Sequence, residues 1–339
     1  MKMYAIIIRP QSPFGTPPKG DTLFGQFCWQ AAEDPGLLDK GLDHWLAGYH
    51  ESPFAVFSSA WPLLRTEQQT WIALPRPSVT DRKNAPANRR EKIEHHKALK
   101  KRKWLLVDFT LSCDMDADRW KNDEELYELF LQGQDRRTRK TLSGLDPVQR
   151  RLVMQTTRTH NTINRRTGTT GSGMFAPYTH DNIQYAPGLS LVIFAAANSQ
   201  ALDGRQLEKG FATMGAWGFG RDATTGLGRF TVEEVRELTW PKARDEHNAC
   251  LTLGPCVPRK KTFVRMVAPP FTRFGRHGAP LAARNPFKTP VIMADEGALL
   301  YPVEKEKIFS LPWIGEAVQG ISAVDKRTVM QGYSLYLPF

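Results

Sequence analysis

The sequence has few of the features that mark catalytic, metal-binding or disulfide-rich proteins. Its 339 residues include four cysteines, Cys28, Cys113, Cys250 and Cys256, and no Cys-x-x-Cys pair. Cys250 and Cys256 flank a short turn, but no second pair completes a zinc site, so we interpret the thiols as small buried apolar groups. It also lacks the His-Glu-x-x-His and Gly-x-Ser-x-Gly motifs of hydrolases. We therefore expect no metal and no cofactor.

Long apolar runs are also missing. The longest run, near residues 189–197, has the length of a buried strand and is too short for a membrane span. The first ten residues, MKMYAIIIRP, have too short an apolar segment for a signal peptide, and no cleavage-like site follows. We expect a cytoplasmic protein, in which disulfides are rare. A length of 339 residues with 41% hydrophobic content suits two globular domains.

Acidic residues are in the minority. There are 46 Lys and Arg against 35 Asp and Glu, which gives a net charge of +11 and a pI near 9.5. This balance favours a polyanionic partner. Two segments concentrate the positive charge, residues 82–103 and residues 136–166. The first is predicted to be largely helical and is equally typical of a solvated surface, whereas the second interleaves arginines with strand-forming residues, amides and a histidine.

One glycine-rich stretch, residues 215–230 with sequence GAWGFGRDATTGLGRF, is the most distinctive local feature. Residues 203–213 before it are predicted to be a helix, and residues 229–238 after it a strand. This order excludes a dinucleotide-binding fingerprint, which opens a helix, and no lysine follows Gly226 as a P-loop requires. Backbone amides of such a loop, with Arg221 and Arg229, can bind anions. The alternative is a structural loop with a basic rim.

The remaining pattern predicts an α+β fold. We expect further strands at 3–9, 54–60, 71–74, 104–111 and 189–195 and helices at 22–32 and 122–132. The acidic segment 114–118 is interpreted as a turn before the second of these helices. With an insertion at about 75–187 set aside, the first half has the order β-α-β-β-α-β of a ferredoxin-like domain.

Several segments resemble one family. The glycine-rich loop, just before the last strand of a ferredoxin-like domain, resembles that of the RAMP superfamily. The start SPFGTPPKGDTLFGQFCW, the segment RTHNTINRRTGTTGSGMF and the Lys-rich segment running into Trp104-Leu105 are similar to the fourth Csm subunit of type III-A CRISPR effector complexes. So are NPFKTPVIMADEGALLYP and the end AVDKRTVMQGYSLYLPF, so the resemblance covers both halves.

The resemblance implies two ferredoxin-like domains, residues 1–240 with the basic insertion and residues 241–339. It also implies a non-catalytic RNA-binding subunit in antiviral defence, which holds the five-prime repeat-derived handle of the CRISPR RNA. The implied protein partners are the large polymerase-like subunit and a backbone Csm subunit. The candidate RNA-binding residues are Lys19, Gly20, Arg158, His160, Asn161, Asn164, Arg165, Arg166, Thr167, Gly168, Gly218, Gly220, Arg221, Gly226, Gly228 and Arg229.

Two other functions stay open at this point. Related RAMP proteins include metal-independent endoribonucleases that use a histidine as general acid or base, and His160 is the one candidate here. An adaptor whose basic surface binds an acidic protein is the second alternative.

Overall fold

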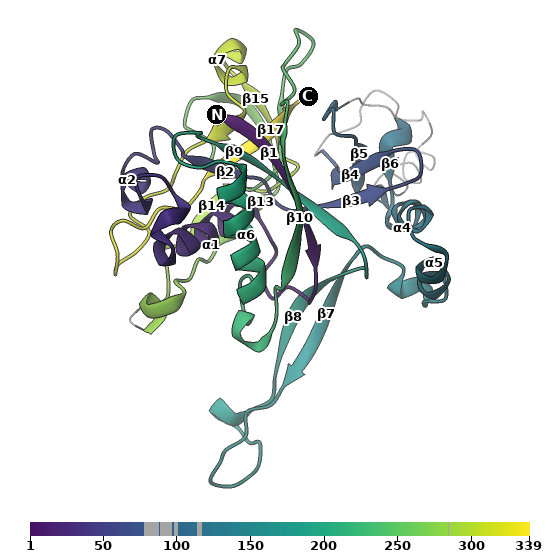
Figure 1. Cartoon of the computed structure of the whole chain (residues 1–339), viewed down its shortest axis with the longest axis vertical. Coiled ribbons are helices and arrows are strands. Elements are labelled where there is room, and N and C mark those ends of the chain that lie inside the picture. Colours follow the sequence, from purple (N-terminus) through teal and green to yellow (C-terminus); the bar gives the residue numbers. More distant parts are fainter. Residues whose placement is uncertain (78–87, 89–96, 98–100, 114–116, 284) are drawn as a thin grey trace.

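The computed structural model describes residues 1–77, 88, 97, 101–113, 117–283 and 285–339 as an α+β fold with antiparallel sheets (Figure 1). The helices are α1 Gly20–Glu33, α2 Leu42–Ala47, α4 Asp123–Gln132, α5 Arg136–Ser143, α6 Gly204–Trp217 and α7 Lys305–Phe309. The strands are β1 Lys2–Pro10, β2 Ala55–Phe57, β3 Trp61–Arg65, β4 Thr70–Pro75, β5 Trp104–Val107, β6 Trp120–Lys121, β7 Val153–His160, β8 Tyr178–Tyr185, β9 Ser190–Ala197, β10 Phe230–Leu238, β11 Cys250–Thr252, β12 Phe263–Val267, β13 Pro270–Arg273, β14 Val291–Ala294, β15 Leu299–Pro302, β16 Trp313–Gly315 and β17 Tyr333–Pro338.

The central sheet is built around β1, which pairs antiparallel with β10 on one side and β9 on the other. Its residues Met3–Ile8 are all buried, as expected of a central strand covered on both faces. β9 pairs in turn with β2 and β3, and the sheet continues through β4, β5 and β6. α1 and α6 lie side by side on one face of this sheet (Figure 1).

The two long helices follow the apolar spacing that the sequence predicts. In α1 the buried positions include Leu23, Phe27 and Ala31, which fall on one helical face. The ring of Phe27 packs 5.4 Å from that of Phe57 and 5.9 Å from that of Phe211 in α6. α6 begins at a capping box and extends four residues beyond the predicted end at 213.

The predicted strand at 54–60 is shorter, β2 Ala55–Phe57, and a further strand, β3 Trp61–Arg65, lies where the sequence predicted a loop. Ser58 causes the break, because its hydroxyl accepts a hydrogen bond of 2.9 Å from the Phe194 amide, an amide that a regular ladder would pair with a backbone carbonyl. The chain then resumes pairing with β9 as β3. The predicted strand at 104–111 is also shorter and ends at Val107.

Two arginines of the basic segment 136–166 have structural roles. Arg139 donates hydrogen bonds to the carbonyls of Leu131, Gln132 and Gln134 at the end of α4. Arg150 does the same for Ser143 and Leu145 after α5. Each guanidinium satisfies carbonyls that a helix terminus leaves unpaired. Most of the first basic segment, 82–103, and residues 114–116 of the acidic turn lie outside the described residues.

The carboxy-terminal half forms a five-stranded antiparallel sheet in the order β12-β15-β11-β17-β16, with β13 and β14 as a separate ribbon. It shares one hydrophobic core with the first half. Gln331 exchanges two hydrogen bonds with the backbone of Phe57, at 2.9 and 2.7 Å, and the Ser59 amide donates to the Leu253 carbonyl. A buried Arg273–Asp21 ion pair also joins the halves.

None of the four cysteines forms a disulfide. Cys250 and Cys256 are buried, and this burial raises the pKa of both thiols. In the part of the chain that the structure describes, no helix is long and apolar enough to cross a bilayer.

Candidate nucleic-acid interface

The most prominent feature of the surface is an arm formed by β7 and β8, which projects from the body at the end opposite α7 and both termini (Figure 1). The two strands pair in regular register from Val153 opposite Tyr185 to His160 opposite Tyr178. We use "the arm" for residues 153–185. It contains eight of the predicted RNA-binding positions: Arg158, His160, Asn161, Asn164, Arg165, Arg166, Thr167 and Gly168.

The tip of the arm is a tight turn organised by Asn164. Its carbonyl accepts hydrogen bonds from the amides of Thr167 and Gly168, at 3.2 and 2.8 Å. Its side-chain oxygen accepts from the Arg166 amide at 3.0 Å. Asn164 and Gly168 therefore shape the turn, and the side chains of Arg165 and Arg166 extend from it into solvent.

The arm carries positive charge that the protein does not neutralise. Arg158, Arg165 and Arg166 are exposed, and among the described residues none of them forms an ion pair. An unpaired guanidinium is a planar donor with the geometry of a phosphate ligand. These three arginines lie on one projecting element, within 8 residues of one another along the arm.

Three rings cluster at the end of the β7–β8 pairing that leads to the tip of the arm. The His160 and Tyr178 rings stack with centroids 5.3 Å apart and an interplanar angle of 11°, and the His180 ring lies 5.2 and 5.0 Å from them. Tyr178 is 45% exposed. The Nδ1 atom of His180 lies 3.3 Å from the carboxylate of Asp222, which belongs to the glycine-rich loop. The cluster therefore connects the arm to that loop.

The glycine-rich loop folds back on itself between α6 and β10. Gly218, Gly220, Gly226 and Gly228 all have positive φ. The Phe219 amide donates to the Gly228 carbonyl at 2.9 Å. At Gly228, where φ is 68°, a Cβ atom would lie 2.1 Å from the Phe219 carbonyl oxygen, so the position requires glycine on both counts.

The loop's backbone amides are mostly committed to holding its own shape. Those of residues 218, 219, 221 and 225–229 donate to backbone or side-chain oxygens of the protein. Three of these bonds reach the segment 12–16, from Arg221 to Thr16, from Gly228 to Pro13 and from Arg229 to Ser12. The glycine pattern suggests an anion site formed by the amides of the whole loop, but these same amides already donate hydrogen bonds within the protein. The loop therefore acts chiefly by positioning the segments that it contacts.

Arg221 is the main side-chain link from the loop to the arm. Its Nη2 atom donates to the Asp181 carbonyl at 2.6 Å and to the Asn182 side-chain oxygen at 3.0 Å. Its Nε atom lies 3.2 Å from the Asp222 carboxylate, and its amide donates to the Thr16 hydroxyl. Arg229 differs, because its side chain is exposed and has no ion pair among the described residues.

The segment 12–16 completes the base of the arm. Phe14 and Ile183 exchange two backbone hydrogen bonds, each of 2.8 Å. The buried Phe14 ring lies 5.5 Å from that of Tyr185 and 6.1 Å from that of Phe219. Three segments far apart in the sequence therefore meet in one packed junction, which fixes the direction of the arm.

Lys19 and Gly20 lie away from this junction, in the contact between the two halves. Lys19 forms ion pairs of 2.5 Å with Asp295 and 2.9 Å with Glu296. Gly20 is buried at the start of α1, where a Cβ atom would clash with the Phe57 carbonyl. Burial raises the pKa of Glu296 to about 8. Burial also acts to raise the pKa of Asp295, but hydrogen bonds from Glu296 and Lys19 outweigh it, and that pKa is lowered.

Sequence reasoning did not identify four residues of this region: Tyr178, His180, Asp222 and Trp217. The first three matter only because the fold brings β8 onto the glycine-rich loop. Trp217 was visible in the GAWGFG motif, and it ends α6 with a side chain 75% exposed. Its indole is exposed to solvent beside the loop, where an aromatic ring can stack on a nucleic-acid base or on a side chain of a partner protein.

No family model and no curated protein matches the sequence. Solved structures do match. A chain of the Csm3–Csm4 subcomplex of a type III-A CRISPR-Cas interference complex is 12% identical, with a TM-score of 0.54 over 100% of this chain and 99% of that one. Chains from Csm1–Csm4 cassettes with pppApA and with cA4 are 14% and 12% identical, with TM-scores of 0.53 and 0.52 over 100% of this chain and 98% of theirs.

Csm4 is the component that these structures have in common. The chain has a Csm4-like fold. The resemblance predicted from the sequence motifs is thereby confirmed at the level of the fold, along its whole length, and so is the α+β class. Within this Csm4-like fold, the arm and the glycine-rich loop occupy one junction rather than two separate sites.

Proposed function

We propose that this chain is a non-catalytic, RNA-binding Csm4-like subunit of a type III-A CRISPR effector complex, and that it holds the five-prime repeat-derived handle of the CRISPR RNA. The Csm4-like fold and the net charge of +11 support this proposal. The observation that carries it is the arm, a projecting ribbon with three unneutralised arginines whose base is locked by the glycine-rich loop.

The chemistry of the arm suits a single-stranded RNA handle. Arg158, Arg165 and Arg166 supply donors for phosphates, and the amide side chain of Asn161 is exposed beside them. The stacked pair His160–Tyr178 offers a partly exposed aromatic surface, which can stack on an unpaired base. Phosphate contacts of this kind position an RNA, and the rings add a contact that a duplex cannot use.

We infer the protein partners from the compositions of the similar structures. Those structures are named as Csm1–Csm4 and Csm3–Csm4 assemblies. Docking of this chain to a large polymerase-like subunit and to a backbone subunit follows by analogy of fold. We assign the RNA contact to the arm and the protein contacts to the rest of the surface.

We also propose a domain division at residues 240 and 241. The first part, 1–240, is consistent with a ferredoxin-like unit, since β10, β1, β9 and β2 are adjacent in that order and α1 and α6 cover one face. For 241–339 a second ferredoxin-like domain has weaker support. The described residues there contain one α-helix, the five-residue α7, where that fold has two long helices.

The proposal is tested by assembling the complex with the Arg158→Ala/Arg165→Ala double variant and measuring RNA recovered per mole of complex. Two charge-assisted contacts are lost, each worth about 1.5–3 kcal/mol when partly buried, so RNA occupancy should fall. Lys305→Ala/Lys307→Ala in α7, at the opposite end of the molecule, is the matched control and should keep wild-type occupancy (Figure 1). Equal occupancy in both double variants would identify the arm as a protein-docking surface, including for an acidic adaptor partner.

A second candidate function has one specific observation in its favour. The Nδ1 atom of His180 lies 3.3 Å from the Asp222 carboxylate, and its ring lies beside those of Tyr178 and His160, an arrangement that can support general acid–base chemistry. We assign His160 to binding, because its ring is stacked on Tyr178. Purified protein incubated without metal with a repeat-containing RNA should therefore leave the RNA intact. Cleavage at one site that His160→Ala or His180→Ala abolishes would establish an endoribonuclease instead.

A further inference from the structure

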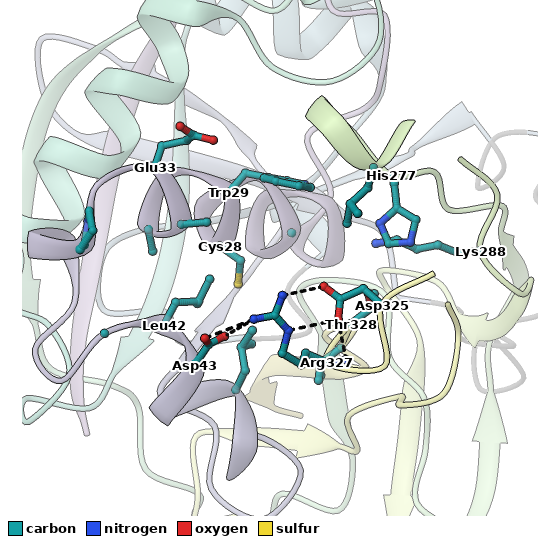
Figure 2. Close-up of a pocket in the computed structure, with 18 residues that line it drawn as sticks. Cys28, Trp29, Glu33, Leu42, Asp43, His277, Lys288, Asp325, Arg327 and Thr328 are labelled. Carbon is teal, nitrogen blue, oxygen red and sulfur yellow. Dashed lines mark hydrogen bonds and ion pairs between the residues drawn. The ribbon is translucent and has the colours of Figure 1, made fainter. Parts of the chain in front are cut away.

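A pocket of about 510 Å³ lies between the two halves of the molecule, far in sequence from the arm (Figure 2). One wall is α1, with Cys28 and the indole of Trp29. The floor is the side chain of Arg327, and the right-hand end in Figure 2 holds His277 and Lys288. The walls are mainly apolar, and pockets of this volume at the junction of two structural units are typical of small-ligand sites.

Among the described residues, the cationic side chains at the pocket are ion-paired with one exception, whereas the lining carboxylate Glu33 forms no ion pair. Arg327 is paired with Asp43 at 3.1 Å and with Asp325 at 3.0 Å. Asp21, in the first turn of α1, is held by Arg273. Glu33 is exposed to solvent at the other end of the pocket.

Lys288 is the exception. It is partly buried, and among the described residues its ammonium forms no ion pair. Burial lowers the pKa of Lys288, and it also lowers the pKa of the adjacent His277. A cation that is removed from water without a counter-ion lowers stability, whereas an anion bound beside it would remove that cost.

We propose that this pocket binds a small aromatic anion, whose ring lies against Trp29 and the apolar face of α1 and whose negative group pairs with Lys288. The pocket supplies a flat indole surface for the ring and a single unneutralised cation for the charge. The ligand would contact both halves of the chain at once. This site is separate from the arm, and the assignment does not depend on the proposed function.

Gly25 gives the proposal a second, independent support and a clean variant. It lies in the middle of α1 and lines the pocket, and a Cβ atom there would meet nothing within 4 Å. Glycine is among the worst helix formers, and no neighbour within the described residues requires it at this position. Its presence keeps the pocket open. Gly25→Leu should therefore fill the pocket while improving the helix.

The test uses two fluorescent probes with the same ring system. 8-Anilinonaphthalene-1-sulfonate carries an anionic group, and N-phenyl-1-naphthylamine lacks it. In titrations of the full chain, the sulfonate should show one saturable site. Lys288→Met should weaken its Kd about tenfold, the usual value of one charge-assisted contact, and leave the neutral probe within about twofold. Gly25→Leu should abolish saturable binding of both probes.

The matched control is Lys307→Met, an exposed lysine on α7, which should change neither Kd. Thermal unfolding of each variant checks that it is folded, and Gly25→Leu should be at least as stable as the wild type. The absence of a saturable sulfonate site in the wild type, or a Kd unchanged in both pocket variants, would overturn the proposal. An equal loss of both probes in Lys288→Met would refute the assignment of the anion to Lys288.

Discussion

Arg221 and Arg229 both lie in the glycine-rich loop, and the structure predicts opposite consequences for losing them. Arg221→Met removes two hydrogen bonds to β8, of 2.6 and 3.0 Å, and the ion pair with Asp222. The Arg229 side chain has no ion pair among the described residues to lose. The first arginine should therefore position the arm, and the second should contact RNA directly.

The magnitude follows from the contacts. A hydrogen bond from a charged donor contributes about 1.5–3 kcal/mol when buried. The Arg221 side chain is 37% exposed and both bonds share one nitrogen, so we expect a combined loss of about 1–3 kcal/mol, confined to the arm. Phe14 and its backbone pairing with Ile183 remain, so the core should stay folded.

Hydrogen–deuterium exchange with mass spectrometry separates the two roles. In Arg221→Met, peptides from residues 153–185 should exchange about 5- to 150-fold faster, the factor equivalent to 1–3 kcal/mol, while peptides from β1 and α1 stay at the wild-type rate. Arg229→Ala should leave exchange unchanged throughout and reduce RNA affinity. If Arg221→Met lowers RNA affinity with no change in exchange of the arm, Arg221 is a direct RNA contact and the positioning role is wrong.

Three further predictions can be checked on the isolated chain. Gly228→Ala should lower the thermal midpoint much more than Gly226→Ala, because both glycines have positive φ but only Gly228 is packed against backbone. RNA affinity should fall as salt rises, and removing Arg158 and Arg165 should make this dependence shallower by about two counterions; an affinity indifferent to salt would contradict the electrostatic mechanism. The pKa of Glu296 is raised to about 8, so this side chain binds its proton more tightly in the folded state than in the unfolded state. Its contribution to the free energy of unfolding is therefore complete below the ordinary carboxyl pKa range and is lost as the pH rises toward 8. The wild type should therefore lose stability relative to Glu296→Gln between about pH 5 and 9, and parallel pH profiles of the two would refute that reading.

The sequence predicted the parts of the fold that local patterns determine. The β-branched run of β1 and the apolar spacing of α1 and α6 are periodicities of single elements, and both were placed within a few residues. The break at Ser58 was missed because it depends on a partner strand 136 residues away. When a serine hydroxyl replaces a backbone carbonyl as the acceptor in a sheet, the neighbouring sequence carries no pattern that predicts it.

The site was predicted less completely, and the reason is physical. A count of positive charge cannot distinguish Arg139, which donates hydrogen bonds to carbonyls at a helix end, from Arg158, which forms no ion pair among the described residues. In the same way, glycine spacing predicted a loop but not the use of its amides, which depends on the segment 12–16 packing against it. The ion pairs of Lys19 with Asp295 and Glu296 could not be predicted either, because they join residues far apart in the sequence.

The central claim is that the arm contacts the handle of the guide RNA, and photo-crosslinking tests it most directly. The complex would be assembled with a CRISPR RNA that carries 4-thiouridine in its five-prime handle, irradiated, digested and analysed by mass spectrometry. The account predicts crosslinked peptides from residues 158–180 of this chain, lost in Arg158→Ala/Arg165→Ala and retained in Lys305→Ala/Lys307→Ala. Crosslinks to other parts of the chain or to other subunits alone, with none in the arm, would contradict it.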